Sequence, residues 1–135
     1  MHEISPRLQD LAERYTAAWC SQAPAKVAEF FAIDGSLTIN GGRPAVGRAE
    51  IGEAARSFMT AFPDLRVRMD RLVPAGENVE YHWTLTGTNT GPGGSGRAVR
   101  ISGFESWRFA EDGLIAESLG SFDSNDYARQ ISRSD

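Results

Sequence analysis

The sequence is poor in the residues that build metal centres and disulfides. It has one cysteine, Cys20, and two histidines, His2 and His82, among 135 residues. A single cysteine cannot form a disulfide within the chain, and this set does not supply the ligands of a protein zinc site. A phosphate-binding loop and a dinucleotide-binding fingerprint are also missing. We therefore expect no metal, no cofactor and a reducing, cytoplasmic compartment, where disulfides are rare.

Two further absences limit the partners of this protein. No apolar run approaches the roughly 20 residues that a membrane span needs, and the first five residues do not read as a signal peptide. Basic residues are not in excess, because 14 Lys and Arg stand against 18 Asp and Glu, for a net charge of -4. Nucleic acids and anionic membranes are bound by basic faces. We therefore expect neither as a partner.

The length and the hydrophobic periodicity predict one domain over residues 1–135, with its core at about 6–131. Apolar residues recur at helical spacing in the first half and alternate with polar ones in the second. Helices are predicted over 6–21, 25–31 and 49–60, a short turn or helix over 124–131, and a turn at 34–35. Strands are predicted over 36–39, 43–46, 65–74, 79–88, 99–109 and 114–122. Helices followed by long antiparallel strands predict an α+β domain in which a curved sheet encloses a cavity.

Several segments resemble the SnoaL-like polyketide cyclases of the nuclear transport factor 2-like superfamily. They are RYTAAW at 14–19, VAEFFAIDG at 27–35, GRAEI at 47–51, FPDL at 62–65, WRF at 107–109 and DGLI at 112–115. The resemblance covers nearly the whole chain. It implies a cone in which three N-terminal helices pack on a curved, mostly antiparallel sheet. The superfamily holds cyclases, isomerases, hydrolases and binding modules, so function has to be argued from individual residues.

Strand alternation places Glu105 on a mostly apolar face. In a cavity, loss of water would raise the pKa of its carboxyl and favour the protonated acid. The simpler interpretation is a strand glutamate that reaches solvent or pairs with an arginine. The resemblance to ketosteroid isomerases puts Glu105 at the position of their protonated acid and Tyr15 at that of their second oxyanion donor. Tyr15 is equally typical of a core tyrosine.

The same resemblance shows departures from the catalytic pattern. Asn40 stands where the isomerases carry their aspartate base, and an amide cannot take a proton at neutral pH. Asn40 could still orient a water or a ligand oxygen. Gly120 stands where the aldol cyclases carry their catalytic aspartate. Asp123 has the opposite parity, and we expect it to cap the C-terminal helix.

The remaining inward positions predict the ligand contacts, which are Trp19, Trp83, Leu85, Trp107, Ser118 and Phe122. The two tryptophans on strands, Trp83 and Trp107, are equally consistent with simple core packing. His82 falls on the outer face of the sheet, and the resemblance implies a homodimer through that face.

Two functions follow as hypotheses. In the first, the protein binds a small hydrophobic carbonyl or polyketide-like compound and acts as a cofactor-independent cyclase or isomerase, with Glu105, Tyr15 and Asn40 as its catalytic residues. In the second, it is a non-catalytic, dimeric domain that binds a small ligand. The absence of an aspartate at Gly120 favours the second, and the joint match of Tyr15 and Glu105 favours the first.

Overall fold

The computed structural model describes residues 4–132, and His2 lies outside this part of the chain. The helices are α1 (Pro6–Cys20), α2 (Pro24–Ala28), α3 (Gly47–Ala61) and α4 (Ser124–Ile131). The strands are β1 (Phe31–Ile39), β2 (Ala45–Val46), β3 (Arg66–Ala75), β4 (Asn78–Thr88), β5 (Ala98–Phe109) and β6 (Ile115–Phe122). Three helices interleaved with two strands precede four long strands, which confirms the predicted α+β class.

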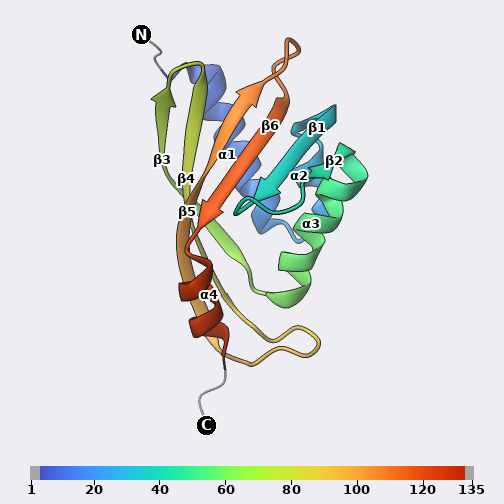
Figure 1. Cartoon of the computed structure of the whole chain (residues 1–135), viewed down its shortest axis with the longest axis vertical. Coiled ribbons are helices and arrows are strands. Elements are labelled where there is room, and N and C mark those ends of the chain that lie inside the picture. Colours follow the sequence, from blue (N-terminus) through green and yellow to red (C-terminus); the bar gives the residue numbers. More distant parts are fainter. Residues whose placement is uncertain (1–3, 133–135) are drawn as a thin grey trace.

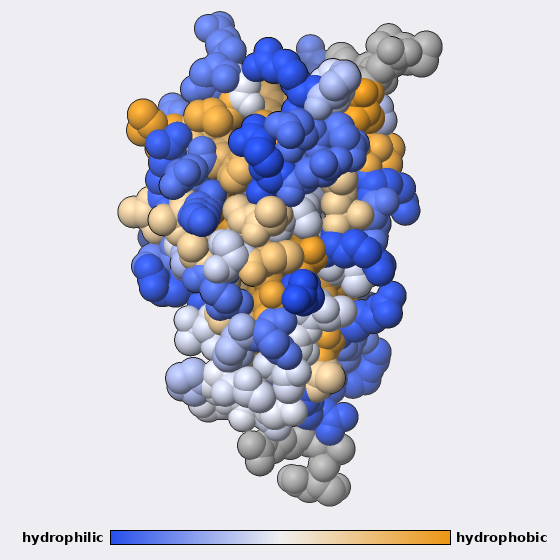
Figure 2. Space-filling view, turned by 180° about the vertical axis from the view of Figure 1, so that it is seen from behind, coloured by the Kyte–Doolittle hydropathy of each residue, from blue (hydrophilic) through white to orange (hydrophobic). Residues whose placement is uncertain are grey.

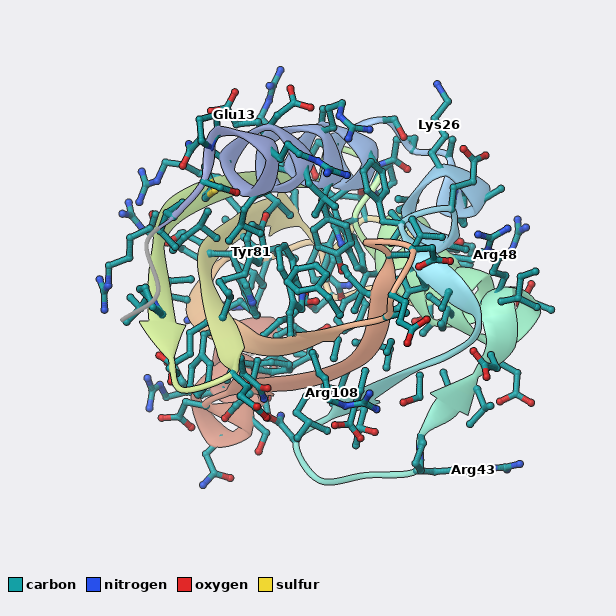
Figure 3. All side chains as sticks on the ribbon, turned by 90° about the horizontal axis from the view of Figure 1, so that it is seen from above. Glu13, Lys26, Arg43, Arg48, Tyr81 and Arg108 are labelled. Atoms are coloured by element: carbon teal, nitrogen blue, oxygen red, sulfur yellow. The ribbon has the colours of Figure 1, made fainter. Side chains whose placement is uncertain are left out.

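The strands form one sheet in the order β2-β1-β6-β5-β4-β3. Only β1 and β6 run parallel, and the other neighbours are antiparallel. The sheet curves, and α1 lies along its concave side, while α2 and α3 lie beside β1 (Figures 1 and 3). In Figure 3, Tyr81 lies in the interior that the sheet encloses, whereas Glu13, Lys26 and Arg48 lie at the periphery. The core therefore occupies the concave side, as the resemblance implies.

Helix α1 shows why the first helix forms where the sequence predicts it. Ser5 caps the helix by accepting a hydrogen bond from the Leu8 amide at 3.1 Å, and Pro6 occupies the first turn. Its buried residues are Ala12, Tyr15, Ala18 and Trp19. Their spacing of three and four puts them on one face of the helix. That face points Tyr15 and Trp19 into the interior of the cone.

The segment after α2 differs from the prediction. The second helix ends at Ala28, and β1 begins at Phe31. Residues 31–35 therefore belong to a strand, whereas the sequence predicts a helix end at 31 and a turn at 34–35. The register between β1 and β6 shifts between Phe31 and Ser36. A Cβ at Gly35 would lie 2.9 Å from the Ile115 carbonyl oxygen, so this glycine permits close approach of the two strands. Long-range strand pairing overrides the local turn signal here.

The C-terminal helix agrees with the prediction. Asp123 caps α4 by accepting a hydrogen bond from the Asp126 amide at 3.0 Å. Strand β6 ends opposite Gly103, so the earlier part of β5 has no strand on that side. There the Gln130 side chain accepts from the Arg100 amide at 2.7 Å and donates to the Arg100 carbonyl at 2.9 Å. Helix α4 therefore completes the hydrogen bonding of an open strand edge.

Figure 2 shows the molecule from behind, with hydrophilic and hydrophobic residues interspersed on that face. Within residues 4–132, none of the helices combines the length and the apolar character needed to cross a membrane.

Candidate functional site

The interior of the cone holds an apolar pocket with a cavity volume of about 60 Å³. Side chains from α1, α3 and all strands except β2 line it. The lining residues are Trp19, Leu37, Ile39, Phe58, Val67, Tyr81, Trp83, Leu85, Ile101, Glu105, Gly120, Ser121 and Phe122. Among them, within the described part of the chain, Glu105 is the one residue with a carboxylate. The pocket is therefore a hydrophobic space with a single acid in its wall.

The carboxyl of Glu105 is held by hydrogen bonds from three side chains. Its Oε1 accepts from the Ser118 hydroxyl at 2.7 Å, from Trp107 Nε1–H at 2.9 Å and from the Tyr15 hydroxyl at 2.9 Å. Its Oε2 has one longer contact, at 3.1 Å, with the same tyrosine hydroxyl. The two oxygens are thus unequal: Oε1 is saturated, and Oε2 retains hydrogen-bonding capacity.

Burial raises the pKa of the Glu105 carboxyl above its ordinary value. Loss of water is the largest cause, and the hydrogen bonds from Trp107, Ser118 and Tyr15 act in the opposite direction. Only 8% of Glu105 is exposed. Burial, together with the charge of Glu105, also raises the pKa of the Tyr15 hydroxyl well above its ordinary value. The tyrosine therefore acts as a neutral hydrogen-bond donor.

Strand register explains how these groups meet. Glu105 pairs with Tyr81 on β4 and with Gly120 on β6, and Trp107 pairs with Ser118. Residues two apart on a strand share a face, so Trp107 and Ser118 point to the same side as Glu105. Aromatic packing fixes the positions of the surrounding rings. Trp107 stacks on Tyr81 with ring centroids 4.7 Å apart, and the Tyr15 ring packs edge-on against Trp107 with centroids 5.2 Å apart. Helix α1 thereby delivers the tyrosine hydroxyl to the carboxyl.

The structure divides the predicted site residues into two groups. Four of the predicted ligand contacts line the pocket, namely Trp19, Trp83, Leu85 and Phe122. Trp107 and Ser118 are fully buried behind it and hold Glu105 instead. Tyr15 is also fully buried and outside the pocket lining, so it supports the carboxyl from behind. Of the three predicted catalytic residues, only Glu105 reaches the cavity.

Asn40 lies outside the pocket, contrary to the expectation that it faces the cavity. It is exposed, with a left-handed backbone φ of 52° just after β1. Its backbone N–H donates to the Gly120 carbonyl at 2.8 Å, and its side-chain Oδ1 accepts from the backbone N–H of Phe122 at 2.9 Å. Asn40 thus fastens the end of β1 to β6. Asparagine tolerates this conformation and bonds to nearby backbone, which explains its presence at the turn.

Gly120 lies in the pocket wall beside Glu105, as its parity predicts. A Cβ built at this position would lie 3.5 Å from the Thr38 carbonyl oxygen and 3.8 Å from Glu105 Cγ. These are ordinary van der Waals distances. The fold therefore leaves room for a Cβ at position 120, where the resemblance implies the catalytic aspartate of the aldol cyclases.

Sequence reasoning did not select several of the lining residues as ligand contacts. These additional lining residues include Phe58 on α3 and Val67, Tyr81 and Ile101 on the strands. Alternation alone identifies Tyr81 and Ile101, because they share a face with Trp83 and Glu105. Ser121 has the opposite parity and follows no such signal.

A curved mixed sheet closed by helices around a pocket is the α+β nuclear transport factor 2-like fold, and solved structures share it with this chain. One is a protein assigned as a SnoaL-like polyketide cyclase from Jannaschia sp. CCS1, with a TM-score of 0.80, 20% identity and full coverage of both chains. A second is a Catenulispora acidiphila protein with a ketosteroid isomerase-like fold, in complex with trimethylamine. It has a TM-score of 0.78 and 17% identity, over 90% of this chain and 92% of that one.

A third structure, TerC co-crystallised with polyporic acid, has a TM-score of 0.72 and 14% identity over 91% of this chain and 96% of that one. A search of curated proteins found no match. The model of the SnoaL-like polyketide cyclase family matches residues 9–131. The chain therefore belongs to the SnoaL-like polyketide cyclase family.

The buried carboxyl predicts a pH-dependent stability. Because folding raises the pKa of Glu105 above its ordinary value of 4.5, the folded state holds this proton more tightly than the unfolded state. The stabilisation is fully present below that value and is lost as pH rises through the raised pKa. We expect the free energy of unfolding of the wild type, relative to Glu105→Gln, to fall across this window by up to about 1.4 kcal/mol per pH unit.

Urea denaturation followed by circular dichroism, repeated from about pH 4 upward, measures this difference. Glu111→Gln is the matched control, because it makes the same chemical change at an exposed residue. A difference between the wild type and Glu105→Gln that stays flat or grows with pH would contradict a raised pKa.

Proposed function

We propose that this SnoaL-like protein binds a small, neutral, hydrophobic carbonyl compound in the pocket, with Glu105 as the hydrogen-bond donor to its oxygen. The apolar lining favours a hydrophobic ligand, and the Glu105 carboxyl, whose pKa is raised by burial, supplies one polar anchor within it. Other proteins of this fold are complexed with small molecules, which is consistent with this use of the pocket. A ligand larger than the cavity requires movement of lining side chains such as Phe58 or Phe122.

The unequal hydrogen bonding of the two Glu105 oxygens is the observation that carries the proposal. Oε1 is occupied by Tyr15, Trp107 and Ser118, all of which donate. Because Oε1 already accepts three hydrogen bonds, we assign the proton of the carboxylic acid to Oε2. Glu105 is also the acid that lines the pocket. A ligand carbonyl can accept this proton as a hydrogen bond, while the three fixed donors hold the carboxyl in place.

This arrangement supports one requirement of an enolisation, which is the stabilisation of the enolate oxygen. A hydrogen bond to a carbonyl oxygen stabilises the negative charge that develops when an α-proton leaves. The geometry differs from the expected pair of oxyanion donors, since Tyr15 donates to Glu105 rather than into the pocket. Cyclisation or isomerisation also requires a base, and Gly120 and Asn40 supply none. This absence favours the alternative proposal, a non-catalytic domain that binds a carbonyl ligand.

Binding of acetophenone, measured by quenching of tryptophan fluorescence, tests the proposed contact. We expect saturable binding whose affinity falls as pH rises through the raised pKa of Glu105, because the ionised carboxyl cannot donate. Glu105→Gln keeps an N–H donor and should remove this pH dependence. Glu105→Leu should lower the affinity about threefold to tenfold, the worth of one neutral hydrogen bond.

Ethylbenzene is the matched ligand control, because it keeps the ring and lacks the oxygen. Its affinity should change little with pH in the wild type. Absence of saturable binding by acetophenone, or an unchanged pH dependence in Glu105→Gln, would contradict the proposal.

Introducing a carboxylate at position 120 should supply a base. A Cβ at Gly120 would lie 3.8 Å from Glu105 Cγ, so Gly120→Asp should place a second carboxyl next to Glu105, and two neighbouring carboxyls then share one proton. We expect exchange of the acetophenone methyl protons with deuterated water to accelerate on the order of a hundredfold over the wild type. Proton NMR follows this exchange, and Gly120→Asn is the isosteric control without a base. Fast exchange in the wild type would instead show that a base is already present.

We further propose that the protein is a homodimer through the outer face of the sheet, and that it acts in the cytoplasm. On this face the His82 ring stacks on that of Phe104 with ring centroids 5.2 Å apart. Leu119, on the strand β6 next to β5, is 44% exposed. An apolar, open sheet face of this kind suits a two-fold contact with a second copy. The single cysteine, Cys20, is free, which is consistent with a reducing compartment.

Leu119→Glu should shift the protein from dimer to monomer. The substitution places two like charges on a two-fold interface, and we expect the dimer to weaken by about tenfold or more. Sedimentation equilibrium measures the change against the monomer mass of 14.7 kDa. Val46→Glu is the control, because Val46 is also exposed and apolar but lies on the edge strand β2. A monomeric wild type, or equal effects of the two variants, would contradict this face as the interface.

A further inference from the structure

The indole of Trp83 carries a buried polar group that the fold leaves unsatisfied. Its Nε1 is buried and, among the described residues, has no hydrogen-bond partner. Trp83 lines the same pocket as Glu105. By contrast, the corresponding N–H of Trp107 donates to Glu105. Buried N–H groups are almost always bonded, because leaving one unpaired costs free energy. An exception in a pocket wall therefore points to a ligand.

The fold holds the Trp83 ring in this position. Trp83 pairs with Gly103 across β4 and β5, and a Cβ on Gly103 would lie 2.8 Å from Cζ2 of the indole. The missing side chain of Gly103 thus provides the space that the ring occupies. Phe122 packs edge-on against the ring, with centroids 6.1 Å apart. Because its neighbours define the ring position, the unpaired N–H is a property of the packed pocket and not of a loose surface side chain.

We propose that Trp83 determines ligand specificity by donating its Nε1–H to a second acceptor oxygen of the ligand. This inference rests on the proposed function, in which Glu105 donates to the first oxygen. Glu105 is two residues from Gly103, so Trp83 and Glu105 are diagonal neighbours on one face of the sheet. The Cα atoms of such positions lie roughly 7–8 Å apart, so one compact ligand can reach both side chains. The preferred ligand is therefore a compact aromatic compound with oxygen acceptors at opposite ends, a diketone or a hydroxyketone.

The pocket chemistry strengthens the preference for an acceptor at this point. The lining near Trp83 is apolar, with Leu85, Ile101 and Phe122 around it. A water at the indole would find few further partners among these side chains, whereas a ligand oxygen brings its own apolar ring to fill the space. A ligand with only one oxygen would leave the N–H unpaired and should bind more weakly.

Two probes of the same shape isolate the second oxygen. 1,4-Diacetylbenzene has an acceptor at each end of the ring, and 4-ethylacetophenone has one end replaced by an ethyl group. The wild type should bind the diketone about threefold to tenfold more tightly than the monoketone. Trp83→Phe should lose this preference while still binding both probes. Tyr127→Phe, which alters an aromatic residue outside the pocket lining, should keep it.

Nuclear magnetic resonance tests the contact in the unaltered protein, independently of whether Trp83→Phe folds. The three tryptophans give three indole N–H signals, and that of Trp83 is assigned through its contact with Phe122. The Trp83 signal should move downfield with 1,4-diacetylbenzene and not with 4-ethylacetophenone, whereas the Trp107 signal should respond equally to both.

The outcomes separate this inference from the function on which it rests. If neither probe binds, the proposed carbonyl-binding function fails. If both bind equally well, or the Trp83 signal responds identically to both, carbonyl binding stands and the role of Trp83 is overturned. Retention of the diketone preference in Trp83→Phe would overturn it as well.

Discussion

A buried carboxyl destabilises a protein unless hydrogen bonds compensate the loss of water, and that constraint organises this molecule. The donors to Glu105 come from β5, from the next strand β6 and from α1, whose Tyr15 lies 90 residues from Glu105 in the sequence. Satisfying the carboxyl therefore ties the first helix to the centre of the curved sheet. The Tyr15 and Trp107 rings also fill the core around it. The contacts that position the Glu105 carboxyl thus also join α1, β5 and β6.

The hydrogen bonds to Glu105 also leave one side of this residue facing the pocket. The donors occupy Oε1 from the packed side, and Glu105 faces an apolar space on the other. Burial raises the pKa of the carboxyl and so favours its protonated form, the form that the proposed contact with a ligand oxygen requires. In the proposed function, this site recognises a ligand oxygen without requiring a charge. A Cβ at Gly120 would make ordinary van der Waals contacts, so the fold tolerates a small side chain at this point of the pocket wall.

Much of the fold could be predicted because strand and helix periodicities are local. The limits of α1 and α4, the four long strands and the inward position of Glu105 all follow from the spacing of apolar residues. The prediction was wrong around Asp34–Gly35, where pairing with a distant strand overrides the local turn signal. It was also wrong for Asn40, because a side chain just beyond a strand end follows the turn and not the strand alternation.

The sequence by itself determined the class of fold, the family resemblance and the set of side chains that face inward, since alternation allows each strand residue only two directions. Only the tertiary structure decided which of those side chains reach the pocket. Tyr15, Trp107 and Ser118 point inward yet are covered, whereas Trp83 and Glu105 line the cavity. That division depends on the register of β4, β5 and β6 and on where α1 packs across them. Those are relations between distant segments that local patterns do not contain.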